Sequence, residues 1–136
     1  MSRVLVIDGY EPIRQTMEFC LPRFGHAALT ACDGTEARRL AAEQAIDVVL
    51  LDGAQRWANG CAVCAQLKRD EHLAGTPVVM MAAMVSAEMR GQARAAGAAE
   101  VVTKPFNWPE LLELLARLAP GAEATAPAAE RRAGGG

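Results

Sequence analysis

The chain has 136 residues, an apolar content of 51% and a net charge of −2 at pH 7. This length and composition suit a single domain with a sizeable core. The small negative charge and the scattered lysines and arginines argue against nucleic acid as a partner, and no apolar run approaches the ~20 residues that a membrane helix needs.

Short β-branched runs alternate with longer segments of helical spacing along the chain. The runs predicted as strands are residues 4–7, 28–31 (the weakest), 48–51, 78–81 and 101–102. Continuous apolar strands separated by helices predict a parallel sheet that is covered on both faces. Five such units fill residues 3 to about 118 and leave no room for a second domain.

Several residues mark where helices begin and end. Pro22 would clash with the carbonyl four residues earlier, so we expect the first helix to kink or end near it. Gly25 and Gly97 are predicted helix terminators. Asn107 is predicted to cap the last helix, with Glu110 at the capping-box position.

The segment 119–136 is rich in Ala, Pro and Gly and has no apolar periodicity. It cannot bury enough surface to offset the entropy of ordering it, so we expect a disordered tail after a domain at 1–118. No secretory leader precedes the first strand, and the four cysteines are expected to be free thiols. These features favour a cytoplasmic protein.

Polar side chains close three of the predicted strands. Asp8 follows the first strand, Asp52 the third, and Lys104 the fifth. In open α/β sheets ligands bind beyond the carboxyl ends of the strands. Two carboxylates suit a divalent cation such as Mg²⁺, and a lysine ammonium suits a phosphoryl group.

The chain resembles the CheY-like receiver domains of two-component response regulators over residues 3 to about 118. Asp52 matches the phosphoacceptor aspartate, and Asn59-Gly60 matches the polar residue and glycine of the following loop. The sequence TKPF at 103–106 matches the lysine-proline motif. The segments 31–37 (ACDGTEA) and 95–106 (AAGAAEVVTKPF) are also similar to the family.

The resemblance implies a flavodoxin-like (βα)₅ three-layer sandwich with a five-stranded parallel sheet of order 2-1-3-4-5. It implies that Asp52 accepts a phosphoryl group from a histidine kinase or phosphotransfer protein, and that Lys104 and the position of Ala82 contact this group. Mg²⁺ would be held by Asp8, Asp52 and the backbone carbonyl of Ala54. The expected role is that of a stand-alone signalling protein, not an enzyme, with the fourth helix, fifth strand and fifth helix docking a target protein.

Three positions depart from the family pattern. Gly9 stands where members carry a second acidic residue that binds Mg²⁺, so we expect weakened metal binding. Ala82 replaces a Ser or Thr whose hydroxyl follows the phosphoryl group, and Val101 replaces the switch aromatic. These departures favour an alternative, a pseudo-receiver that recognises a protein partner without phosphorylation.

Other residues allow two interpretations each. Cys61 and Cys64 form a C-x-x-C pair that suits either core packing on one helix face or a thiol redox or metal site. Trp57 is either an exposed interface residue or a lid packed over the site. His26 and His72 fall in predicted loops, where we expect solvated structural roles.

Overall fold

Five strands and five helices alternate along the part of the chain that the computed structural model describes, residues 2–53 and 56–119. The strands are β1 (Ser2–Ile7), β2 (His26–Ala31), β3 (Val48–Asp52), β4 (Val78–Ala82) and β5 (Glu100–Thr103). The helices are α1 (Glu11–Arg23), α2 (Gly34–Glu43), α3 (Trp57–Arg69), α4 (Ala87–Ala95) and α5 (Trp108–Leu118). No helix in these ranges is long and apolar enough to span a bilayer.

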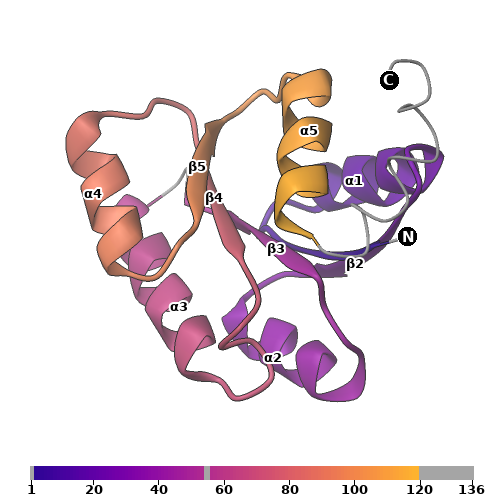
Figure 1. The fold of residues 1–136 in the computed structure, drawn as a ribbon, viewed down its shortest axis with the longest axis horizontal. Coiled ribbons are helices and arrows are strands. Elements are labelled where there is room, and N and C mark those ends of the chain that lie inside the picture. Colours follow the sequence, from indigo (N-terminus) through magenta and orange to yellow (C-terminus); the bar gives the residue numbers. More distant parts are fainter. Residues whose placement is uncertain (1, 54–55, 120–136) are drawn as a thin grey trace.

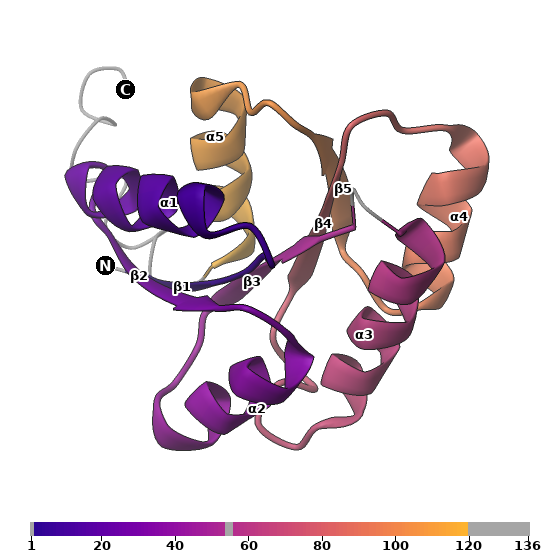
Figure 2. The same cartoon turned by 180° about the vertical axis from the view of Figure 1, so that it is seen from behind.

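The strands form one parallel sheet with the order β2-β1-β3-β4-β5 (Figures 1 and 2). From β1 the chain adds β2 on one side, and then adds β3, β4 and β5 in turn on the other side. The carboxyl ends of β1 and β3 therefore lie side by side, with Ile7 opposite Leu51. The predicted flavodoxin-like fold is therefore confirmed.

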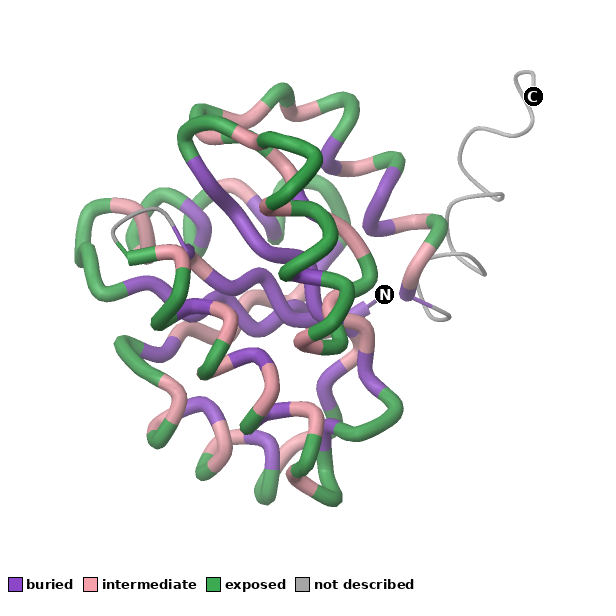
Figure 3. The backbone as a smooth tube through the Cα atoms, turned by 90° about the vertical axis from the view of Figure 1, so that its left-hand side faces the viewer, coloured by how far each residue is buried: buried purple, intermediate pink, exposed green. Residues whose placement is uncertain are grey.

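Helices cover both faces of the sheet, with α1 and α5 on one side and α2, α3 and α4 on the other (Figures 1 and 2). Successive residues of a strand point to opposite faces. Leu5 and Ile7 thus pack with the three-helix layer, and Val4 and Val6 pack with the two-helix layer. Figure 3 shows the buried sheet enclosed by helices that are exposed on their outer sides.

Most of the predicted helix ends match the structure. Pro22 lies in the last turn of α1, which ends one residue later, and Gly25 follows with a φ of 89°. Gly97 closes α4 with a φ of 100°. The Asn107 side chain accepts a hydrogen bond of 3.0 Å from the backbone N–H of Glu110 and so caps α5.

The start of β2 and the end of α5 differ from the sequence analysis. His26 begins β2 instead of lying in a solvated loop, and its buried ring contacts Ser2 Oγ across the sheet. Burial holds the pKa of His26 below its ordinary value. Ala119, assigned to the tail, is buried in the core beside α5, and the predicted disorder at 120–136 lies outside the described residues.

Candidate phosphoacceptor site

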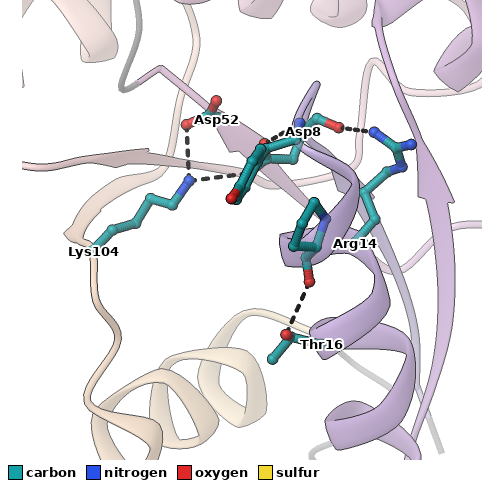
Figure 4. Close-up of polar contacts among 7 residues, drawn as sticks. Asp8, Arg14, Thr16, Asp52 and Lys104 are labelled. Atoms are coloured by element: carbon teal, nitrogen blue, oxygen red, sulfur yellow. Dashed lines mark hydrogen bonds and ion pairs between the residues drawn. The ribbon is translucent and has the colours of Figure 1, made fainter.

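The three predicted polar residues meet at the carboxyl edge of the sheet (Figure 4). Asp8 follows β1, Asp52 ends β3, and Lys104 follows β5. Because β1 and β3 are parallel neighbours, their ends bring the two carboxylates together. Lys104 reaches them from beyond β4, and its backbone N–H donates to the carbonyl of Ala82, 2.9 Å away.

The Lys104 ammonium bridges both carboxylates. Its Nζ lies 2.9 Å from Asp8 Oδ2 and 3.1 Å from Asp52 Oδ1. The side chains are only 17%, 1% and 14% exposed for Lys104, Asp8 and Asp52 respectively, so water screens these charges poorly. Burial alone would lower the pKa of Lys104, but the hydrogen bonds and charges of the two carboxylates outweigh it and raise the pKa above its ordinary value.

The loop after β1 holds Asp8 in one orientation. Asp8 Oδ1 accepts a hydrogen bond of 2.9 Å from the backbone N–H of Tyr10, which precedes α1. The Arg14 guanidinium donates to the Asp8 carbonyl at 2.7 Å (Figure 4). This brace by Arg14 was not predicted, because nothing in the local sequence pattern indicates which backbone oxygen a helix arginine will reach.

Gly9 leaves an open position beside Asp8. A Cβ added there would meet no atom closer than the Cys32 carbonyl oxygen at 3.9 Å. Position 9 is exposed and is not among the glycines with a positive φ. The backbone would therefore accept an acidic side chain at the position where the family pattern has one.

The other two departures lie on the β4–β5 side of the site. Ala82 ends β4, is only 2% exposed and has no side-chain group beyond its methyl. Val101 is 6% exposed and packs into the core of the three-helix layer. Neither residue supplies a hydroxyl or an aromatic ring that could follow a group bound at Asp52.

The start of α3 packs closely against the backbone that follows Asp52. An added Cβ at Gly53 would lie 2.9 Å from Cε3 of Trp57. An added Cβ at Gly60 would lie 3.0 Å from Gly53 Cα and 3.5 Å from the Asp52 carbonyl oxygen. Trp57 is therefore half-buried against Gly53 and the core of the three-helix layer instead of being an exposed interface residue, and its role as a lid over the site stays a prediction. The Asn59-Gly60 pair brings the helix onto the strand end.

The close approach of Gly60 to Gly53 predicts how an added methyl group at position 60 would change stability. We expect Gly60→Ala to lower the free energy of unfolding by about 1–3 kcal/mol, because Met80 Cε at 3.1 Å can move aside but the backbone atom Gly53 Cα at 3.0 Å cannot do so without shifting the strand end. Gly91→Ala in α4 is the matched control, since its Cβ meets nothing within 4 Å and should raise stability by about 0.5–1 kcal/mol. Urea denaturation measures both; equal stability of Gly60→Ala and wild type would show that α3 does not need this close approach.

A cavity of about 190 Å³ opens beside the two carboxylates. It is bounded by the ends of β1 and β3, the loop before α2 and the start of α3. Its lining residues are Ile7, Asp8, Gly9, Cys32, Asp33, Gly34, Leu51, Asp52, Arg56, Asn59, Gly60 and Val63. The cavity gives a ligand direct access to Asp52.

The donor set fits a Mg²⁺ ion held largely by water. Mg²⁺ commonly binds through one or two carboxylates and keeps several waters, and Asp8 and Asp52 supply two such groups. Within residues 2–53 and 56–119 no cluster of three His, Cys, Asp or Glu side chains forms a metal site. The predicted carbonyl ligand, Ala54, lies outside the described residues. A cation at this site would compete with the Lys104 ammonium for the carboxylates.

The C-x-x-C pair lies in the packing between α3 and α4. Cys64 is fully buried, and its thiol contacts the Ala96 carbonyl oxygen at 3.5 Å. Burial, followed by the proximity of Cys61, raises the pKa of Cys64 to about 11. Burial also raises the pKa of Cys61. Both thiols are therefore protonated at neutral pH, which favours core packing over redox chemistry.

Residues 4–116 match the family described as the response regulator receiver domain. The chain belongs to this family. The receiver domain is similar to the protein PilG of Pseudomonas aeruginosa, with 31% identity over 110 residues that cover 81% of this chain and 82% of PilG. It is 33% identical to the DNA-binding dual master transcriptional regulator RpaA of Synechocystis over 112 residues, which are 82% of this chain but only 46% of RpaA.

Solved structures agree with the fold of this receiver domain. The chemotaxis protein CheY4 of Vibrio cholerae superimposes with a TM-score of 0.79 at 30% identity, covering 87% of this chain and 98% of CheY4. The receiver domain of a sensor histidine kinase from Pseudomonas aeruginosa superimposes with a TM-score of 0.73 at 23% identity, covering 86% and 96% of the two chains. That structure has a magnesium ion coordinated in its active-site cleft.

Proposed function

We propose that this receiver domain accepts a phosphoryl group on Asp52 from a phosphohistidine of a histidine kinase or phosphotransfer protein. The observation that carries the proposal is the convergence of Asp8, Asp52 and Lys104 at one edge of the sheet, next to an open cavity. An Asp52 oxygen forms the new bond to phosphorus as the bond between phosphorus and the imidazole nitrogen breaks. The electron pair of the broken bond stays with the imidazole.

Lys104 and Asp8 have distinct roles in this step. The Lys104 ammonium already contacts Asp52 and would neutralise charge on the transferred group, which is the main requirement of phosphoryl transfer. Asp8, held by Tyr10 and Lys104, would orient the Mg²⁺ site together with Asp52. When bound, Mg²⁺ supplies further neutralisation of the phosphoryl oxygens. The magnesium in the cleft of the histidine kinase receiver domain supports this assignment.

Output would proceed by docking a target protein on the face of α4, β5 and α5. This face carries a cavity of about 180 Å³ lined by residues of α4, β5, the segment between β5 and α5, and the start of α5, among them Arg90, Val101 and Phe106. An ion pair of 3.6 Å joins Arg90 to Glu100 at its edge. The receiver domain would act as a stand-alone signalling protein in the cytoplasm, and the docked target would carry the signal onward.

A second candidate function is favoured by the methyl group of Ala82 and the small side chain of Val101. Both lie where a receiver normally transmits phosphorylation, and Gly9 removes one metal ligand. A ligand shifts a conformational equilibrium only by its different affinities for the two states. Without the usual hydroxyl and aromatic ring, a phosphoryl group would distinguish less between the two conformations. The domain would then act as a pseudo-receiver that binds its partner whether or not Asp52 is modified.

The test is incubation of the protein with acetyl phosphate and Mg²⁺, followed by intact-mass measurement. We expect the wild type to gain the mass of one phosphoryl group and Asp52→Asn to gain none. Asp33→Asn is the matched control, because Asp33 lines the same cavity and an asparagine still caps α2.

A wild type that never gains mass while an Asp52→Asn variant still signals would overturn the phosphoacceptor proposal and support the pseudo-receiver.

A further inference from the structure

The charges around the cavity beside Asp52 are unevenly distributed. Three of its lining residues are aspartates, Asp8, Asp33 and Asp52, whereas Arg56 is the one Lys or Arg among the described residues that line it. Lys104 contacts the carboxylates but does not line the cavity. A dianionic group entering from this side therefore meets an acidic wall with a single cation.

The carboxylates of this wall already have partners. Both Asp8 oxygens are occupied, one by the Tyr10 N–H and one by Lys104, and Asp33 Oδ1 accepts from the Glu36 N–H. In contrast, within residues 2–53 and 56–119 the Arg56 guanidinium forms no ion pair within 4.0 Å, unlike those of Arg39 and Arg90. Arg56 is exposed and available to an incoming anion.

The backbone of Arg56 is nevertheless fixed at the site. Arg56 immediately precedes α3, and its carbonyl accepts a hydrogen bond of 2.9 Å from Gly60 N–H. Gly60 in turn packs on Gly53 and Asp52. The long side chain thus starts from a point that is tied to the strand end carrying Asp52.

We propose that Arg56 contacts the phosphoryl group of Asp52 as a second cation, on the cavity side of the carboxylates. The inference rests on the proposed function and deepens it by adding a residue that touches the substrate. A guanidinium forms paired hydrogen bonds with phosphoryl oxygens and stays charged at all working pH values. Arg56 thereby supplies hydrogen-bond donors that Ala82 cannot supply from the β4 side.

The test uses fluoroberyllate, a mimic of the phosphoryl group that binds to a carboxylate, titrated in the presence of Mg²⁺ and followed by ¹⁹F NMR. We expect Arg56→Gln to weaken fluoroberyllate binding roughly tenfold, the worth of one charge-assisted hydrogen bond. Arg56→Lys should lose less, because it keeps the charge without the planar fork. The salt dependence of binding should also be shallower for Arg56→Gln than for wild type.

Arg69→Gln is the matched control, since Arg69 is an exposed arginine at the opposite end of α3, in its last turn. It should bind fluoroberyllate as the wild type does. Equal affinities of Arg56→Gln and wild type would overturn the inference, while mass gain from acetyl phosphate in the wild type would leave the phosphoacceptor proposal standing. If the wild type neither binds fluoroberyllate nor gains mass, both proposals fail.

Discussion

Replacing Lys104 with methionine is expected to lower the free energy of unfolding by about 3 kcal/mol at neutral pH, because it leaves two poorly solvated carboxylates facing each other without a cation. The carboxylate of Asp8 is 1% exposed and cannot regain the lost interaction from water. The same variant should not gain phosphoryl mass from acetyl phosphate. Urea denaturation and intact-mass measurement test the two effects separately.

Lys68→Met provides the matched control for Lys104→Met. Lys68 is the other lysine of the chain and is also partly buried, but its ammonium donates to a neutral acceptor, the Thr76 carbonyl, at 2.7 Å. We expect a loss of only about 1 kcal/mol for Lys68→Met. Equal losses of unfolding free energy for the two variants would show that the contribution of Lys104 to stability does not come from its charge interactions with Asp8 and Asp52.

The stability difference between wild type and Lys104→Met should depend on pH on the alkaline side. The pKa of Lys104 is raised in the folded state above the ordinary value of 10.5, so its contribution is fully present below that pH. It is lost as the pH rises through the folded-state pKa. The difference should therefore be constant at neutral pH and shrink above about pH 10.5.

Gly9→Asp is expected to strengthen Mg²⁺ binding roughly tenfold, because it adds a charged oxygen ligand next to Asp8. The space is present, since an added Cβ meets only the Cys32 carbonyl oxygen at 3.9 Å. Without metal the variant should lose about 1 kcal/mol of stability, because a third carboxylate joins two others. Calorimetric titration with Mg²⁺ measures the affinity.

Gly9→Asn separates charge from shape in this experiment. The amide has nearly the same size as the carboxylate but adds no negative charge, so most of the gain in affinity should be absent. If Gly9→Asp binds Mg²⁺ no better than Gly9→Asn and wild type, position 9 does not face the metal, and the explanation of weak binding by Gly9 is wrong.

The fold could be predicted from the sequence because its signals are local and periodic. Apolar runs such as 48–51 are buried on both faces, and residues such as Asn107 and Gly97 end or begin helices for reasons of backbone chemistry alone. The start of β2 was missed because His26 breaks the apolar pattern. Its burial depends on a contact with Ser2 in the neighbouring strand, which no local pattern reveals.

The site was only partly predictable. Asp8, Asp52 and Lys104 could be brought together because parallel strands end at one edge of the sheet. The Arg14 brace, the packing of Trp57 on Gly53 and the cavity next to Arg56 depend on side-chain directions in three dimensions. Sequence spacing alone left Trp57 equally suited to an exposed interface and a lid.

The central claim is that Asp52 carries a phosphoryl group when the protein functions. The most direct test is mass spectrometry of the protein recovered from cells, with peptide mapping after reductive trapping of acyl phosphates. We predict that the peptide containing position 52 carries the mass change of reductive trapping in the wild type, and that the corresponding peptide of Asp52→Asn does not. A wild-type protein recovered under signalling conditions with no label at Asp52 would contradict the claim.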